Sequence, residues 1–398
     1  MNKKLIAVAV AGVLAAPAVM AENSVTIYGV ADVGLEHVEA KGATTANADV
    51  VGRTRVTPNS SYLGFKGQEE LGGDLKAIWQ IEQGVDLDDG GGTSTNGFAT
   101  RDSYVGLNSK SAGTVMMGRL STPTRALLGK LDVFPGQTGM GANTAIIGNT
   151  GQKQKMGGLA FDTRKANAVS LSTPSIAGLN ATLAYIADEN RSAAGVDPWG
   201  WGAGVTYAGG PLTVMLAYEE HRNTNGLNAN DTTSAAAITP QGGTARGSLD
   251  TNMRVGVGFK GGPVTVNAVY ESLDLRSGGA SKLERDDVAP VYELKRDAFW
   301  IGAKLTAGNH EVRAALAQSM KATVTKNFVE SDVDNSEARQ ISLGYGYNFS
   351  KRSQVYAVYS SVDNKSAAQY DFGLGKSKTG TAVGADPEGY SVGVRHLF

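Results

Sequence analysis

The sequence predicts an all-β protein, a 16-stranded antiparallel β-barrel that spans a membrane. Three observations lead to this fold class: an alternating segment that ends the chain on Phe398, a cleavable leader at the other end, and tight turns that recur along the chain. A chain end in water usually frays, whereas the last strand of a closed barrel must pair with the first. A soluble sandwich or β-solenoid, the alternative class, explains neither the terminal phenylalanine nor the alternation of short and long connections.

The first 21 residues have the features of a secretory signal peptide. Lys3 and Lys4 give a basic start, an apolar stretch follows, and Val19-Met20-Ala21 offers a cleavage site. The apolar stretch is shorter than the roughly 20 residues that a membrane-anchoring helix needs. We therefore expect cleavage after Ala21, a barrel over residues 22–398, and a location in the bacterial outer membrane.

Composition narrows the classes of function. Removing Lys3 and Lys4 from 37 basic residues leaves 35 against 38 acidic residues, a net charge of −3, which gives no footprint for nucleic acid. The chain has no cysteine, so neither disulfides nor thiolate chemistry is expected. The four histidines lie in no metal-ligand spacing, and the GxGxxG pattern at Gly256 lacks a following helix. No nucleophile-elbow sequence occurs, so we expect no enzyme, no cofactor and no metal site.

Seven tight turns organise the mature chain into hairpins. Glycine, proline, asparagine and serine mark the turns, and alternating segments flank each of them. The turns lie at residues 71–74, 109–113, 176–178, 208–211, 261–263, 307–309 and 350–352. Seven hairpins contribute fourteen strands, and single strands over 24–37 and 389–398 bring the number to sixteen. An even number places both termini on the periplasmic side, and sixteen strands leave a water-filled lumen.

Longer polar stretches separate the hairpins, and we expect them to be strand-free loops on the cell exterior. They run over residues 38–59, 86–97, 120–161, 188–198, 221–250, 274–297, 321–338 and 362–388. Several are too long for unstructured loops in a compact domain, and regular alternation with short turns explains them as the outer loops of a barrel. The third loop, residues 120–161, is the longest.

Fragments at both ends and over the first five predicted strands carry a recognisable order and spacing. They are residues 24–32 (SVTIYGVAD), 61–67 (SYLGFKG), 69–77 (EELGGDLKA), 101–107 (RDSYVGL), 115–119 (VMMGR) and 394–398 (VRHLF). Together they resemble the trimeric general porins of Gram-negative bacteria, in the branch found in relatives of Neisseria and Comamonas. The resemblance implies a homotrimer in the lipids of the outer membrane, inserted by the barrel assembly machinery through the strand that ends at Phe398. It also implies passive diffusion of small hydrophilic solutes and inorganic ions past an inward-folded third loop.

The resemblance implies a constriction wall as well. Lys66, Arg101 and Arg164 match basic wall positions, whereas Tyr62 stands where relatives commonly carry arginine. Strand parity gives an independent indication for Lys66, because Leu63 and Phe65 share the opposite face. A charge on the lipid face costs roughly 2–4 kcal/mol at mid-membrane, so Lys66 and Tyr62 should face the lumen.

The same parity argument points Gln80 and Glu82 inward. At Arg101 the alternation is less clear. Arg101 would share a face with Val105, although Tyr104 on the other face is the better contact for lipid. Aromatic residues near strand ends are expected, in part, in the girdles at the two membrane interfaces. These residues are Tyr28, Trp79, Tyr104, Tyr207, Trp300, Tyr347 and Phe398, of which Tyr28 has lumen parity.

The third loop has an excess of positive charge. It carries Arg125, Lys130, Lys153 and Lys155 against one acid, Asp132. Charge focused at a narrow opening concentrates counter-ions, so we expect a mild preference for anions. Asp132 is the candidate for the acidic side of a transverse field. The alternative is that some of these lysines lie on the flanks of the loop and never reach the opening.

A substrate-specific channel or a receptor-like barrel is the alternative function. Specific sugar channels line their path with aromatic residues, and the lumen-phase positions show no obvious run of them. A plugged transporter needs a further domain before the first strand, which here begins directly after the leader. Residues 86–90 (DLDDG) are similar to a calcium loop but lack its glutamate at the twelfth position, which leaves open only a loosely bound divalent ion between loops.

Overall fold

The computed structural model describes residues 24–89, 97–134, 139–149, 161–187, 189, 197–228, 239–242, 247–276, 292–326, 329–373 and 378–398. Strands dominate these residues, and the helical segments are short. They are α2 (Pro123–Leu131), η1 (Gly139–Gly141) and η2 (Asn143–Ala145). Within the described residues, no helix combines the length and the apolar character needed to cross a bilayer.

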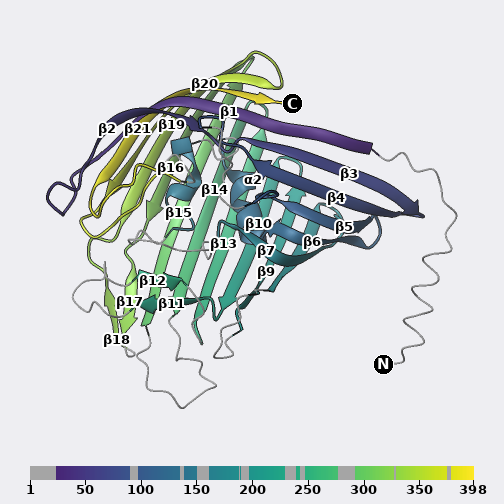
Figure 1. The fold of residues 1–398 in the computed structure, drawn as a ribbon, viewed down its shortest axis with the longest axis horizontal. Helices are drawn as coiled ribbons and strands as arrows, with labels where there is room; N and C mark the ends of the chain where they lie inside the picture. Colours follow the sequence, from purple (N-terminus) through teal and green to yellow (C-terminus); the bar gives the residue numbers. More distant parts are fainter. Residues whose placement is uncertain are drawn as a thin grey trace.

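The strands form a closed antiparallel ring (Figure 1). They are β1 (Ser24–Lys41), β2 (Val50–Pro58), β3 (Tyr62–Gly72), β4 (Leu75–Gly84), β5 (Ser103–Ser109), β6 (Gly113–Ser121), β7 (Arg164–Ser172), β8 (Leu179–Ala187), β9 (Trp199–Gly209), β10 (Leu212–Arg222), β13 (Leu249–Gly261), β14 (Val264–Arg276), β15 (Tyr292–Ala307), β16 (His310–Ser319), β19 (Ala338–Asn348), β20 (Ser353–Asn364) and β21 (Asp386–Leu397). The first strand, β1, pairs with β3 on one side and with β21 on the other, which closes the ring. Both β2 and β3 pair with β1 and form one interrupted barrel strand. Counted so, the described residues form the predicted sixteen strands.

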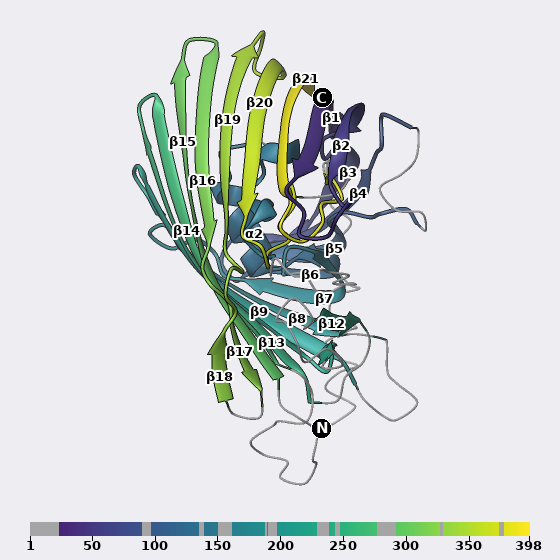
Figure 2. The same cartoon turned by 90° about the vertical axis from the view of Figure 1, so that its left-hand side faces the viewer.

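The seven predicted turns are confirmed. Each joins two neighbouring antiparallel strands, from the β3–β4 connection to the β19–β20 connection. Figure 2 shows the turn from β15 to β16 and the C terminus at one end of the barrel. The β17–β18 hairpin lies at the opposite end in the same view. Short turns and long loops therefore occupy opposite ends, as the sequence predicts.

The expectation that the long stretches contain no strands is wrong in three places. Strand β2 lies within residues 38–59, β11 (Asn225–Asn228) pairs with β12 (Thr239–Gly242), and β17 (Thr323–Lys326) pairs with β18 (Val329–Asp332). Strand β2 was hidden by its polar composition. Its Arg53 and Arg55 donate hydrogen bonds to the carbonyl oxygens of Thr379 and Lys378, so this part of the strand meets another loop instead of an apolar layer.

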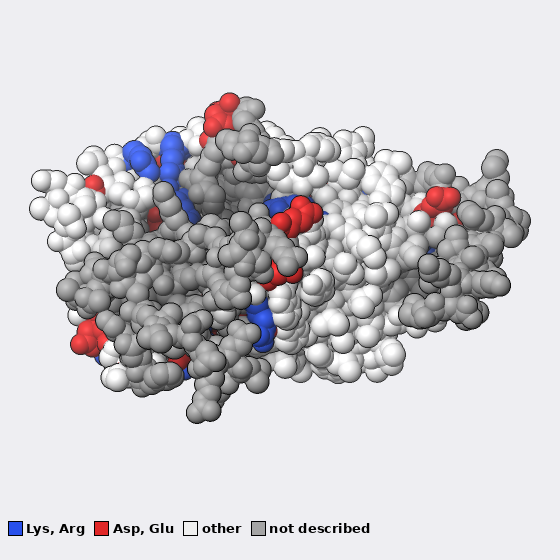
Figure 3. Space-filling model, turned by 60° about the horizontal axis from the view of Figure 1, so that its bottom comes forward, with Lys and Arg blue, Asp and Glu red and all other residues white. Residues whose placement is uncertain are grey.

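The outer face of the barrel is apolar. Along β13, the outward-facing Met253, Val255 and Val257 are exposed, while Arg254 and Gly256 between them are buried on the inner face. Figure 3 shows a broad stretch of this surface without charged residues. Side chains that alternate between an exposed apolar face and a polar interior are the pattern of a barrel in lipid.

Two aromatic residues depart from the expected interfacial girdle. Trp300 is only 1% exposed and packs inside the barrel, next to Val133 of the third loop. Tyr104 has Asp102 and Glu82 as charged neighbours, while Val105 beside it is 65% exposed on the outer face. The reason is that Arg101 and Asp102 precede β5 and do not follow its alternation.

The third loop lies against the inner face of the barrel, and α2 packs on β9, β10, β13 and β14 (Figure 1). Leu131 of α2 lies where a side chain at Gly256 of β13 would otherwise stand, and Phe134 uses the space beside Gly344 in the same way. Glycines in these strands let the loop approach the wall closely.

Candidate functional site

The inner face of β1, β3 and β4 carries a connected group of aromatic and charged residues. The hydroxyl of Tyr28 donates to Oε1 of Glu82 at 2.8 Å, and the Nε of Arg101 lies 3.2 Å from Oε2 of the same carboxylate. The Arg101 guanidinium lies over the Tyr62 ring, 4.3 Å from its centroid. The Lys66 ammonium lies 4.9 Å from the centroid of the Tyr28 ring. Parity thus placed Lys66 and Glu82 correctly on the inner face.

A second cationic group lies beside the first, where β6 and β7 meet the third loop. The Nε of Arg164 lies 2.6 Å from Oδ2 of Asp102, and Asp102 also accepts hydrogen bonds from Ser121. Arg119 donates from Nε to the carbonyl oxygen of Thr100 at 2.9 Å and has Arg164 and Asp102 as charged neighbours. The sequence pattern did not single out Arg119, because a bulge in β6 after Gly118 breaks the alternation there.

The third loop adds Arg125 and Lys130 from α2. Arg125 donates to the carbonyl oxygen of Asp162. Among the charged groups near Arg125, Arg164 has the largest electrostatic influence on it. Burial, together with Arg164, lowers the pKa of Arg125 to about 10, so the guanidinium stays charged at neutral pH. Lys130 is exposed on α2.

The carboxylate of Asp132 is turned into its own loop. It accepts the backbone N–H of Phe134 at 2.9 Å and that of Asn143 at 3.2 Å. Burial raises the pKa of Asp132 to about 7, although both hydrogen bonds favour the charged form. Its role as the acidic side of a transverse field stays a prediction. The loop residues Lys153 and Lys155 lie outside the described residues.

A buried network of charges holds the end of the third loop to the wall. Arg254 of β13 binds the Asp162 carboxylate through both terminal nitrogens and lies 2.6 Å from Glu271 of β14. Glu271 also pairs with Arg296 of β15 at 2.9 Å and accepts the backbone N–H of Gly148 at 2.8 Å. Because Arg254 and Glu271 are fully buried, these partners compensate charges that would otherwise be very costly.

The beginning of α2 has its own anchor. The hydroxyl of Thr124 donates to Glu219 of β10, whose other carboxylate oxygen lies 2.8 Å from Nε2 of His221. The His221 ring stacks on Phe161 with centroids 4.6 Å apart. The third loop is therefore held to the wall at both of its ends.

Cations without an ion-pair partner gather on the inner wall beside the third loop. Four acids each have an arginine at ion-pair distance: Asp32 with Arg395, Glu82 with Arg101, Asp102 with Arg164, and Glu311 with Arg313. Beside the third loop lie four described cations that have no carboxylate at ion-pair distance, namely Lys66, Arg119, Arg125 and Lys130. These four side chains therefore add positive charge beside the third loop.

The first and the last strand meet in a buried polar cluster. Asp32 of β1 accepts the hydroxyl of Tyr356 at 2.7 Å and lies 2.9 Å from Arg395 of β21, its direct cross-strand neighbour. Phe398 exchanges two backbone hydrogen bonds with Gly29, at 3.1 and 3.2 Å. The last residue therefore extends the pairing of β21 with β1.

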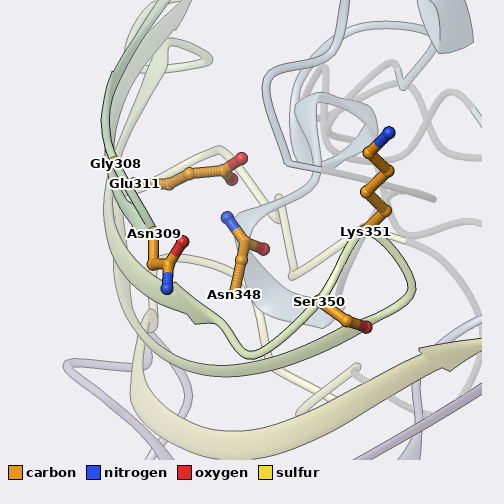
Figure 4. A pocket seen from close by; sticks show the side chains of 6 residues that line it. All are labelled: Gly308, Asn309, Glu311, Asn348, Ser350 and Lys351. Carbon is orange, nitrogen blue, oxygen red and sulfur yellow. The ribbon is translucent and has the colours of Figure 1, made fainter.

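A pocket of about 500 Å³ lies between two short turns of the barrel. It is lined by Gly308, Asn309, Glu311, Asn348, Ser350 and Lys351 (Figure 4). Among the residues that the structure describes, no cluster of three or more His, Asp or Glu side chains could hold a metal ion. The inner wall beside the third loop is therefore the candidate site.

A family model described as Gram-negative porin matches residues 7–368. The chain belongs to the Gram-negative porin family. Outer membrane porin protein 32 of Delftia acidovorans is 28% identical to this porin over 410 residues and the whole of both chains. An outer membrane porin protein of Bordetella pertussis is 28% identical over 432 residues, again across the whole of both chains. The anion-selective porin from Comamonas acidovorans superposes with a TM-score of 0.71 at 25% identity, covering 95% of this chain and 100% of that one.

The porin is thus a β-barrel of the outer membrane that forms a water-filled channel. Sequence reasoning did not identify the network around Arg254, Glu271 and Arg296. A signal was present, because these charged residues stand at inward positions between apolar neighbours such as Met253 and Val255. Parity alone cannot show that they bind the third loop.

Proposed function

We propose that this porin passes small hydrophilic solutes by passive diffusion, with a mild preference for anions. The opening lies between the third loop and the inner wall of β3 to β7. One observation carries the charge preference, namely the four cations of this region that have no carboxylate at ion-pair distance within the described residues. Positive charge at a narrow opening raises the local concentration of anions. The Comamonas acidovorans relative is itself described as anion-selective, which supports the same sign.

The proposal assigns a role to each residue of the constriction. Lys66, Arg101 and Arg164 form the basic wall, with Tyr62 and Glu82 between them. Arg125 and Lys130 bring positive charge from the third loop. Asp132 supplies a negative charge that depends on pH, because its pKa lies near 7.

We also propose three features of maturation and assembly. The signal peptide is removed after Ala21, the barrel assembly machinery recognises the strand that ends at Phe398, and three copies associate. Membership of the porin family supports the trimer and the signal peptide, and the pairing of Phe398 with Gly29 supports a role for the terminal residue in closure. The family consists of channels, which supports the absence of a catalytic function.

The test is the reversal potential of the purified, refolded protein in a planar bilayer under a gradient of potassium chloride. We expect a reversal potential of the sign that chloride permeation produces. Each insertion event should add three equal units of conductance. A cation preference would keep the channel and overturn the charge argument. A folded protein without conductance would overturn the open channel and favour a plugged or receptor-like barrel.

A further inference from the structure

Three tyrosines gather on the inner wall next to Lys66. Tyr28 and Tyr62 meet edge to face, with their ring centroids 6.2 Å apart. Tyr104 shares their face, since Gln80 pairs with Lys66 on one side and with Tyr104 on the other. We call Tyr28, Tyr62 and Tyr104 the tyrosine patch. Tyr28 and Tyr62 were expected at lumen positions, and Tyr104 joins them although it was expected to contact lipid.

The rings of the patch are fixed in position. Tyr28 lies flat on the wall, where a side chain at Gly64 would overlap its ring, and its hydroxyl is held by Glu82. The second oxygen of Glu82 faces Arg101, and Glu82 is only 8% exposed. Arg101 in turn lies over the Tyr62 ring. The acid behind the patch is therefore neutralised, and the wall offers aromatic surface to the lumen instead of negative charge.

Lys66 provides a free cation at the edge of this surface. Its side chain is exposed, and it has no carboxylate at ion-pair distance among the residues described. Its ammonium group lies near Tyr28, yet an ammonium has three donors and can bind an oxygen anion while it stays over the ring. A cation without a carboxylate partner therefore stands 4.9 Å from the centroid of the Tyr28 ring, which itself meets Tyr62 edge to face.

We propose that the tyrosine patch and Lys66 form a transient binding site for aromatic carboxylates, solutes of the benzoate class. The carboxylate binds the Lys66 ammonium, and the ring packs against Tyr28 and Tyr62 in an offset or edge-to-face arrangement. This site rests on the proposed function, because it lies on the path of the diffusing solute. Weak binding suits a channel, since a solute has to leave the site as readily as it enters.

The experiment compares three sodium salts on the refolded protein in planar bilayers bathed in potassium chloride. Benzoate supplies the charge and the aromatic ring, cyclohexanecarboxylate supplies the charge and a saturated ring, and acetate supplies the charge alone. The measurement is the concentration that halves the chloride current. We expect benzoate to act at a concentration about fivefold lower than cyclohexanecarboxylate, because only an aromatic ring gains from the ring geometry. Acetate should be the weakest.

Variants locate the effect. In Tyr62→Leu, the benzoate concentration that halves the chloride current should rise to that of cyclohexanecarboxylate. In Tyr62→Phe, benzoate should still halve the current at the lower concentration. Lys66→Gln should raise the half-blocking concentrations of both benzoate and cyclohexanecarboxylate. Tyr207→Leu, a change of an outward-facing tyrosine that is 41% exposed, should alter neither.

Two results would overturn the site while leaving the channel intact. One is equal action of benzoate and cyclohexanecarboxylate on the wild-type protein. The other is an advantage of benzoate that survives in Tyr62→Leu. A wild-type protein that carries no chloride current would instead overturn the proposed function, so the two failures are distinguishable.

Discussion

Arg254 on β13 binds Asp162, at the end of the third loop, with its two terminal nitrogens at 2.7 and 3.0 Å from the two carboxylate oxygens. The same guanidinium reaches Glu271 of β14 and the carbonyl oxygen of Thr124 in α2. One side chain of the wall therefore fixes both the beginning and the end of the loop. The third loop is therefore anchored by a fully buried residue of the wall.

Replacing Arg254 should loosen the third loop. The variant Arg254→Leu leaves Asp162 buried without its cation, and breaking a buried pair costs about 3–5 kcal/mol. We expect a lower free energy of unfolding in urea and larger fluctuations of the open single-channel current. The matched control is Arg276→Leu, because Arg276 belongs to an ion-pair group at the water-exposed end of β14. Equal current noise in wild type and Arg254→Leu would contradict this role.

Reversing the charge at Lys66 should move the selectivity toward cations. The change Lys66→Glu removes one uncompensated positive charge from the inner wall and adds a negative one. We expect the permeability ratio of chloride to potassium to fall about twofold or more, measured as a reversal potential. Lys110→Glu, in the exposed turn between β5 and β6, is the control and should shift the potential less. An unchanged potential in Lys66→Glu would place Lys66 outside the constriction.

The anion preference should increase as pH falls from 8 to 6. Burial raises the pKa of Asp132 to about 7, so its negative charge is present above that pH and is lost below it. The raised pKa also means that ionisation of Asp132 costs folding stability as pH rises through 7. Asp132→Asn should hold the reversal potential near its acidic value at every pH.

Reversal potentials at pH 8, 7 and 6 test this pH dependence. His221 is the second titratable group to control, because it lies beside Glu219 under the beginning of α2. If Asp132 is the source of the pH dependence, the reversal potential of His221→Gln should change with pH as it does in the wild type. A pH-dependent potential in Asp132→Asn would assign the effect to another group.

Removing Asp32 should weaken the junction between the first and the last strand. Asp32→Ala leaves Arg395 and the hydroxyl of Tyr356 without their shared acceptor, at a cost of about 3–5 kcal/mol for a buried pair. The loss of stability is measured by urea unfolding, with the gel mobility of the folded barrel as the signal. Glu388→Ala, an exposed acid on β21, is the control and should change the midpoint little. Equal midpoints for the two variants would show that the cluster does not secure closure.

The strand order was predictable because it rests on local signals. Turn residues punctuate the chain, and alternation over short segments such as residues 255–259 shows which side meets lipid. The same logic placed Lys66 on the inner face. It failed at Arg101 and Tyr104, because Arg101 lies before the strand begins, and parity has no meaning outside a strand.

Other features depend on partners that are remote in sequence. Strand β2 is too polar to be recognised as a strand, since its arginines bond to carbonyl oxygens of a loop more than three hundred residues later. The binding of Asp162 by Arg254 and the stacking of Arg101 on Tyr62 exist only once the ring has closed. Residue types indicate that such charges need partners, and only the fold selects which ones.

The pairing of β1 with β21 also constrains when this protein can fold. Val30 lies opposite Leu397, so the first strand to leave the ribosome waits for the last before its second edge is covered. Contacts of such high sequence separation form late and make folding slow. A product that ends before β21 keeps two open sheet edges, which invite aggregation. Such a truncated chain should be removed by proteases during export instead of accumulating as a smaller channel.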